Sequence, residues 1–187
     1  MILHFSSTHR CNNEKIMNSS SINKILIDKT ILHQEIIKKL ELVYASALAA
    51  TQTAIDTATD KENVPEHKYD TLSLEASYLA HGQAQRLQQC LRDLHSFKDL
   101  AVKNCLDSDS VNIGALVKLL DDDEDSYKWF FLSPVAGGLS VQFSNIIVQL
   151  ITPESPLGKT LMRRAVDDEI VIKIATHTKC YEIMSIY

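Results

Sequence analysis

Paired cysteines, long apolar runs and known catalytic signatures are all missing from this sequence. The four cysteines lie far apart, at Cys11, Cys90, Cys105 and Cys180. Without a CxxC pair or a tight Cys/His cluster, neither a zinc site nor a redox motif is expected. Scattered free thiols fit a reducing compartment, so we expect a cytoplasmic protein. No apolar run approaches the roughly 18–20 residues that span a bilayer, and we expect no membrane partner.

An excess of positive charge is also missing. Lys and Arg number 19 against 24 Asp and Glu, so the net charge is -5 at pH 7. The basic footprint of a nucleic-acid-binding protein is therefore absent, and contact with a polynucleotide would be local or pass through a protein partner. Residues 1–22 are rich in Ser and Asn and lack a clear period. We predict that they form a disordered tail, and the short apolar part, broken by His4, predicts no secretory signal.

Glycine and proline are scarce, and both are absent from residues 28–58. Asp28 is a plausible helix N-cap, and apolar residues then recur every three or four positions, as on one face of a helix. This stripe consists of Leu32, Ile36, Leu40, Val43, Ala47, Ala50 and Ala54. A polar break around Pro65 follows, and a second helix is predicted from about residue 66 to 99. Its stripe consists of Leu72, Leu79, Leu87, Cys90 or Leu91, Leu94 and Phe97.

Two long helices joined by a short polar break should pair antiparallel. At 1.5 Å per residue, each helix of about 30 residues would span about 45 Å. Two such helices alone bury little surface, so we predict a rod that protrudes from another structure. We assign this coiled-coil hairpin to residues 23–100, with its tip near residues 59–69.

The hydrophobic period changes to that of β-strands after residue 110. Predicted strands cover residues 111–120, 126–132, 141–151 with a break near Ser144, 170–174 and 181–186. Ser155 followed by Pro156 predicts the capped start of a short helix. The chain is therefore predicted to be α+β, with an antiparallel or mixed sheet and one short helix over residues 111–187. Residues 101–110 are the predicted linker.

Two motifs resemble ligand-binding sites but lack the residues that those sites require at fixed positions. Gly158-Lys159-Thr160 looks like the end of a phosphate-binding loop, but the residue five positions before Gly158 is proline rather than glycine. The acidic run 121–125 suggests calcium. An EF-hand loop would need Gly and Glu where this chain has Ser126 and Leu132. We interpret the acidic run as a solvated hairpin turn.

The polar break between the two helices contains the remaining candidate site. It holds Asp60, Glu62, Glu66 and Asp70, and the last two are four residues apart, hence on one face if the helix has begun. Taken alone, a solvated helix end accounts for these acids, which also favour the macrodipole. The functional alternative is a rod whose end carries Mg²⁺ into another protein's site. Magnesium typically binds one or two carboxylates together with water and a phosphate group.

Residues 111–187 resemble the C-terminal domain of Gre factors, which are bacterial transcription elongation factors that stimulate transcript cleavage. The resemblance rests on Val111–Gly114, on the acidic turn, on Ser155–Lys159 followed by Leu161, and on Asp168–Ile170. It implies an FKBP-like domain that docks on RNA polymerase, with the hairpin as the family's coiled coil. The docking residues that it implies are Ser155, Pro156, Leu157, Gly158, Lys159, Asp168 and Glu169.

Two departures from the Gre pattern are present. The family usually has Gly-Asp-Glu where this chain has Asp167-Asp168-Glu169. The tip string Asp-Leu-Ser-Glu-Asn of the family is missing as well. Glu66 and Asp70, with Glu62 in reserve, are the candidate substitutes, and they would hold Mg²⁺ that is shared with the polymerase.

Three functions follow as hypotheses. The first is a factor whose coiled coil enters the secondary channel of RNA polymerase and stimulates cleavage of back-tracked RNA. The second is a non-cleaving regulator or inhibitor in the same channel, and the third, from another class, is an FKBP-like isomerase or chaperone. Under the first two the protein is a monomeric accessory factor rather than an enzyme, with no tightly bound cofactor. Its contact with the RNA and DNA of the elongation complex would be indirect.

Overall fold

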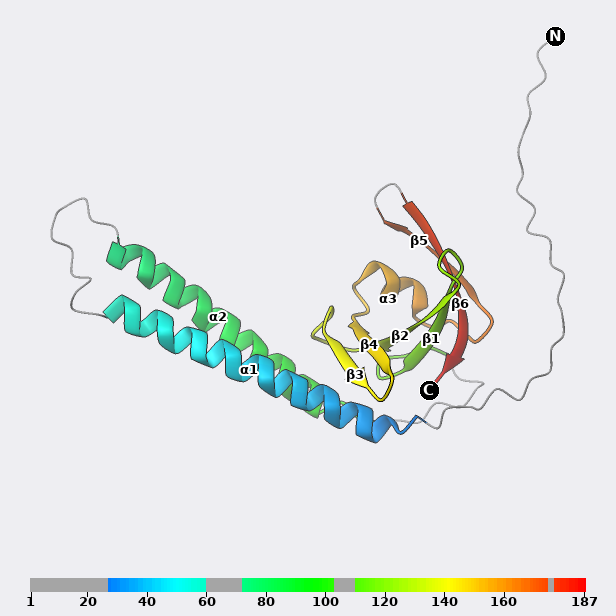
Figure 1. Ribbon diagram of the computed structural model, residues 1–187, viewed down its shortest axis with the longest axis horizontal. Coiled ribbons are helices and arrows are strands. Elements are labelled where there is room, and N and C mark those ends of the chain that lie inside the picture. The colour runs from blue at the N-terminus through cyan, green and yellow to red at the C-terminus, as the bar shows by residue number, and fades with distance from the viewer. Residues whose placement is uncertain (1–26, 60–71, 103–109, 175–176) are drawn as a thin grey trace, which may run out of the picture.

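A long helical hairpin extends from a sheet domain (Figure 1). The computed structural model describes residues 27–59, 72–102, 110–174 and 177–187. Helices α1 (Lys29–Thr59) and α2 (Leu72–Lys98) run side by side and form the hairpin. The predicted α+β architecture is confirmed. Among the described residues, no helix is long and apolar enough to cross a membrane.

Helix α1 begins where the sequence predicts. The carboxylate of Asp28 accepts hydrogen bonds from the backbone N–H groups of Thr30, at 2.9 Å, and Ile31, at 3.3 Å. These bonds satisfy two of the donors that a helix N-terminus leaves unpaired. The helix then continues for 31 residues. At 1.5 Å per residue this length is about 46 Å.

The buried faces of the two helices agree with the predicted stripes at seven positions and differ at two. Val43, Leu87 and Cys90 are half-buried, and the side chain of Leu72 lies outside the described residues. Ala50 is exposed and Thr51 is buried in its place, with its hydroxyl donating to the carbonyl of Ala47 at 2.8 Å. Leu79 is 56% exposed, whereas Ala76 is buried. At the coiled-coil period of 3.5 residues per turn, Ala76 lies six whole turns before Phe97, whereas Leu79 lies about 50° away from that line. The stripe residues that are buried as predicted are Leu32, Ile36, Leu40, Ala47, Ala54, Leu94 and Phe97.

The sheet is mixed and has six strands in the order β3-β4-β2-β1-β6-β5. The strands are β1 (Leu116–Asp121), β2 (Ser126–Leu132), β3 (Ser140–Phe143), β4 (Ile146–Ile151), β5 (Glu169–Ile174) and β6 (His177–Ile186). The pair β2–β4 is parallel and the other pairs are antiparallel.

The predicted break near Ser144 is confirmed. The first strand begins at Leu116 instead of residue 111, because a turn closed by the Ala115 N–H and the Asn112 carbonyl precedes it. Strand β6 begins four residues before the predicted strand 181–186.

Each face of the sheet has its own hydrophobic core. One core lies on the face that carries the short helix α3 (Pro156–Leu161), and includes Val117, Phe130 and Ile183. The other core joins the base of the hairpin to the opposite face, and includes Ile36, Phe97, Trp129, Phe131 and Leu150. Successive residues of β2 alternate between these two cores, as the period of two in a strand requires.

The base of the hairpin is connected to the sheet by specific contacts. The rings of Phe97 and Phe131 lie 5.8 Å apart, and His33 stacks on Phe97 at 4.8 Å. The buried side chain of Lys29 donates from Nζ to the main-chain oxygen of Tyr187 at 2.9 Å. The last residue is in turn paired with Leu116 of β1. The first turns of α1 and the last turn of α2 are therefore fixed to the sheet.

Leu94→Ala and Leu79→Ala make a matched pair of variants on one helix. Leu94 is 6% exposed and Leu79 is 56% exposed. We expect Leu94→Ala to lower the free energy of unfolding by about 2–5 kcal/mol, because it leaves a cavity. Leu79→Ala should change it by less than about 1 kcal/mol. Urea denaturation followed by circular dichroism measures both, and equal effects would contradict the observed packing of α2.

Candidate functional site

The segment Ser155–Lys159 builds the start of α3. The hydroxyl of Ser155 accepts a hydrogen bond from the N–H of Gly158 at 3.0 Å and donates to the carbonyl of Thr152 at 2.7 Å. Pro156 occupies the first helical turn, where its lack of an N–H costs nothing. The predicted N-cap is confirmed, and Ser155 acts within the loop.

Gly158 is required because the chain approaches itself closely here. A Cβ atom added to Gly158 would lie 2.0 Å from the carbonyl oxygen of Thr152. Leu157 is half-buried and packs against the core on this face. Only Pro156 and Lys159 of this segment are exposed. Contacts within the loop therefore determine its conformation, and the side chains of Pro156 and Lys159 remain available for contact with a partner.

The second predicted docking segment, Asp168 and Glu169, forms the turn that leads into β5. The carboxylate of Asp168 accepts a hydrogen bond from the Ala165 N–H at 2.9 Å, with the Arg164 guanidinium 4.0 Å away. Asp167 has a φ of 68°, so a non-glycine residue adopts the left-handed conformation where the Gre pattern has glycine. Glu169 is exposed at the start of β5. Since α3 contacts β5, the structure brings the two predicted docking segments together.

The acidic turn after β1 is only partly solvated, which corrects the sequence interpretation. Residues 122–125 are exposed, but Asp121 is completely buried. Its Oδ2 lies 2.6 Å from Nζ of Lys128 and 3.4 Å from Nζ of Lys179. Glu124 lies 3.1 Å from both lysines. These four charges join β1, β2 and β6 across the end of the sheet.

The pKa values of this cluster follow from burial and pairing. Burial alone would raise the pKa of Asp121, but hydrogen bonding and the charges of Lys128 and Lys179 bring it below its ordinary value. Hydrogen bonds from the two lysines also lower the pKa of Glu124. The pKa of Asp122 is raised, first by partial burial and then by the charge of Glu169. The acidic turn thus lies beside the second docking segment.

The predicted tip site lies outside the described residues. Glu62, Glu66 and Asp70 all fall in the segment 60–71. Within the ranges that the structure describes, no group of three or more His, Cys, Asp and Glu residues could hold a metal ion. The Mg²⁺ assignment to Glu66 and Asp70 therefore stays a prediction.

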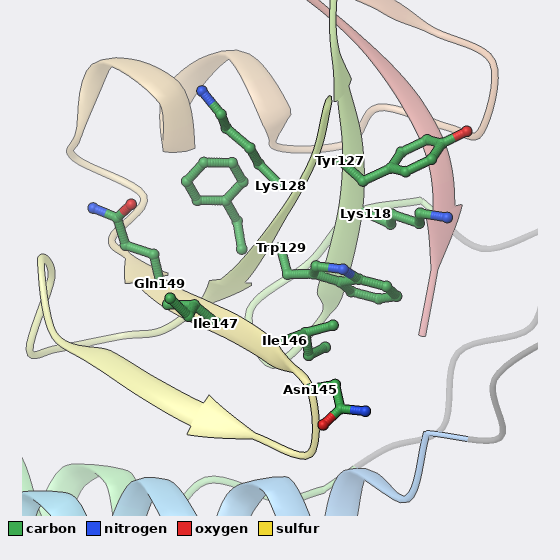
Figure 2. Close-up of a pocket in the computed structure, with 9 residues that line it drawn as sticks. Lys118, Tyr127, Lys128, Trp129, Asn145, Ile146, Ile147 and Gln149 are labelled. Atoms are coloured by element: carbon green, nitrogen blue, oxygen red, sulfur yellow. The ribbon is translucent and has the colours of Figure 1, made fainter. Parts of the chain in front are cut away.

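A groove between β2 and β4 was not predicted from the sequence. Its volume is about 690 Å³, and Figure 2 shows the side chains around it. It is lined by Lys118, Tyr127, Lys128, Trp129, Phe130, Asn145, Ile146, Ile147 and Gln149. Except for Asn145, which lies in the turn before β4, these residues come from β1, β2 and β4, and the parallel pairing of β2 with β4 brings them together. No local sequence pattern predicts that pairing, so sequence reasoning had no signal for the groove.

Comparison with known proteins agrees with this architecture. Residues 106–187 match the family model for the C-terminal domain of the transcription elongation factors GreA and GreB. A GreA transcription elongation factor of Novosphingobium aromaticivorans is 32% identical over 119 residues, which cover 62% of this chain and 71% of the relative. The chain belongs to the GreA/GreB family. The GreA of Lachnoclostridium phytofermentans is 36% identical to this family member over 91 residues, 47% of this chain and 51% of the relative.

Solved structures were also matched to this GreA/GreB-family protein. The GreA factor homolog 1 (Gfh1) of Thermus thermophilus is 19% identical, with a TM-score of 0.34, and the match covers 84% of this chain and 93% of that one. A GreA/GreB elongation factor of Nitrosomonas europaea is 14% identical, with a TM-score of 0.32, and the match covers 60% and 91%. The resemblance to Gre factors proposed from the sequence is confirmed by the family model and the GreA relatives.

Gly158→Ala and Gly82→Ala test the close approach in the docking loop of this Gre-family protein. An added Cβ at Gly158 meets a carbonyl oxygen, whereas a Cβ at Gly82 of α2 meets nothing within 4 Å. We expect Gly158→Ala to destabilise the sheet domain. Gly82→Ala should instead stabilise the helix by about 1 kcal/mol, because alanine is the better helix former. Thermal unfolding compares the two, and a tolerated Gly158→Ala would show that the loop does not depend on this contact.

Asp121→Asn tests the buried carboxylate through the pH dependence of stability. A folded-state pKa below the ordinary 3.8 contributes stability that is present above about pH 4 and is lost as pH falls through the lowered value. The variant should cost about 1–3 kcal/mol at neutral pH. Both lysines keep 30% of their side-chain surface exposed, so we expect the lower part of that range.

The measurement for Asp121→Asn is urea denaturation near neutral pH and again near pH 2.5. The difference from the unsubstituted protein should shrink at the lower pH, because a lowered folded-state pKa contributes stability that is lost as pH falls below the ordinary value of 3.8. Asp123→Asn, at an exposed position of the same turn, is the control and should have little effect. A constant difference at both pH values would rule out the ion pairs as its cause.

Proposed function

We propose that this protein binds RNA polymerase through its sheet domain and inserts its hairpin into the secondary channel to stimulate cleavage of back-tracked RNA. The observation that carries the proposal is the family match over residues 106–187, which includes both docking segments. Pro156, Lys159 and Glu169 are the exposed members of those segments. They are the side chains that would contact the polymerase. The protein would act as a monomer in the cytoplasm.

The geometry of the hairpin supports delivery of its tip to a distant site. Helix α1 alone is about 46 Å long. The core around Phe97 fixes its base to the sheet. A docked sheet domain would therefore hold the far end of the hairpin at a defined distance, deep within its partner.

The chemistry would belong to the polymerase. In a two-metal site, paired ions stabilise the attacking and the leaving oxygen of an in-line displacement. Glu66 and Asp70, with Glu62 in reserve, would help to hold the second Mg²⁺ and orient the attacking water. The protein would then be an accessory factor, with only indirect contact with RNA and DNA.

A non-cleaving channel regulator is the second candidate. The observation in its favour is the missing Asp-Leu-Ser-Glu-Asn string, which removes the family's usual pair of tip acids. Docking and insertion would be the same under this alternative. The outcome would be slowed elongation or competition with a cleavage factor.

An assembled back-tracked elongation complex tests the proposed cleavage. With Mg²⁺ and this protein added, we expect the RNA to shorten from its 3′ end. The double variant Glu66→Ala, Asp70→Ala should lose this activity by a factor of ten or more, since each lost metal contact raises the barrier. Gel analysis of labelled RNA measures the rate.

A matched control removes two acids from the base of the hairpin. Glu35 and Glu41 form exposed ion pairs with Lys38 and Lys98, which contribute little to stability. Glu35→Ala with Glu41→Ala should cleave normally. Binding without shortening would favour the non-cleaving regulator. Failure to capture core RNA polymerase in a pull-down would overturn both candidates.

A further inference from the structure

The groove between β2 and β4 exists because the two strands diverge. They are paired only from Trp129 with Val148 to Leu132 with Ile151. Residues 126–128 of β2 pair with β1 on one side, and on the other side they have no partner among the described strands. Backbone N–H and C=O groups along this short edge are therefore available to an added strand.

The lining of the groove exposes large apolar side chains. Ile147 is 64% exposed although β4 lies inside the sheet between β3 and β2, and Tyr127 is 53% exposed. Trp129 and Phe130 of β2, on opposite faces of the sheet, are buried. In Figure 2, Ile147 and Gln149 extend from β4 on one side of the groove, while Tyr127 and Lys118 lie on the other. This surface favours a ligand with a bulky apolar group.

The groove also presents one positive charge. Lys128 at its rim is neutralised by Asp121 and Glu124. Nζ of Lys118 lies 3.7 Å from the centre of the Tyr127 ring, and Lys118 takes part in none of the ion pairs found among the described residues. A cation–π contact holds an ammonium group in place without neutralising its charge. Lys118 is therefore positioned to receive a carboxylate.

We propose that this groove binds an extended segment of a partner protein in which a large apolar side chain stands beside a carboxylate. The free edge of β2 would add the segment as a short strand. Ile147 would contact its apolar side chain on one face of the sheet, and Lys118, beside Tyr127 on the other face, would pair with the neighbouring acid, because consecutive side chains of a strand point to opposite faces. A nucleic acid is a poor fit, because a single lysine outside the ion pairs, Lys118, can receive one carboxylate but cannot neutralise a run of phosphates. The groove is separate from the segment Asp168–Glu169, since β1 and β6 lie between β2 and β5.

Selection from a displayed library of random peptides on the full-length protein tests this inference without any polymerase. We expect enrichment of peptides that carry a large apolar residue next to Asp or Glu. Trp129 is the only tryptophan and lines the groove, so its fluorescence should shift when such a peptide binds. Ile147→Glu should weaken binding by about tenfold or more, because it places a charge in the apolar contact.

Val171→Glu is the matched control for Ile147→Glu. Val171 is a β-branched residue on β5, 54% exposed and outside the groove, so its substitution should leave binding unchanged. Tyr127→Ser tests the opposite wall of the groove should Ile147→Glu prove unfolded by circular dichroism. Lys118→Glu should reverse the selected charge, from acidic to basic peptides.

Three results would overturn the inference. The first is a library that yields no enriched peptides. The second is a set of selected peptides that bind Ile147→Glu and Tyr127→Ser as tightly as they bind the unsubstituted protein, and the third is a selection on Lys118→Glu that again enriches acidic peptides. Because the proposed function is measured by RNA cleavage and polymerase capture, each proposal can fail while the other stands.

Discussion

The packing of Phe97 between the hairpin and the sheet is the contact on which the rest of this architecture depends. Two paired helices alone bury too little surface to fix the orientation of the hairpin. Its direction is set where its base packs against the sheet domain. Phe97 lies at the last turn of α2, stacked by His33 of α1 and close to Phe131 of the sheet. Lys29 reinforces the same junction through Tyr187. A core at one end of the hairpin thus sets where the other end points.

The Gre-like motif combines residues that build the loop with residues that can meet a partner. Ser155 and Gly158 are occupied by contacts within the loop, one as a cap and the other by the lack of a side chain. Asp168 is likewise engaged with the backbone at Ala165. Pro156, Lys159 and Glu169 remain exposed beside them. A motif of this kind can identify a family because its internal contacts permit few other residues at these positions. Only the exposed members of the motif are available to bind a partner.

Sequence reasoning succeeded where a local rule decides the outcome. The cap at Asp28, the capped start of α3 and the break between β3 and β4 all follow from short-range hydrogen bonding or from turn residues. The predicted buried residue was one position off at Ala50, where Thr51 is buried instead, and three positions off at Leu79, where Ala76 is buried instead. The reason is that apolar residues in these helices fit more than one helical stripe. The burial of Asp121 was missed because its lysine partners come from two other strands.

The sequence by itself determined the element types, the family and the α+β order of the chain. Hydrophobic period, capping residues and turn residues are local, and so is the spacing of the C-terminal motif. Only the tertiary structure decided which faces are buried and which charges meet. It also produced the groove, where Trp129 of β2 pairs with Val148 of β4 and the two strands then separate. The physical reason is that such contacts join residues distant in sequence, and their stability comes from packing and long-range pairing that no local pattern encodes.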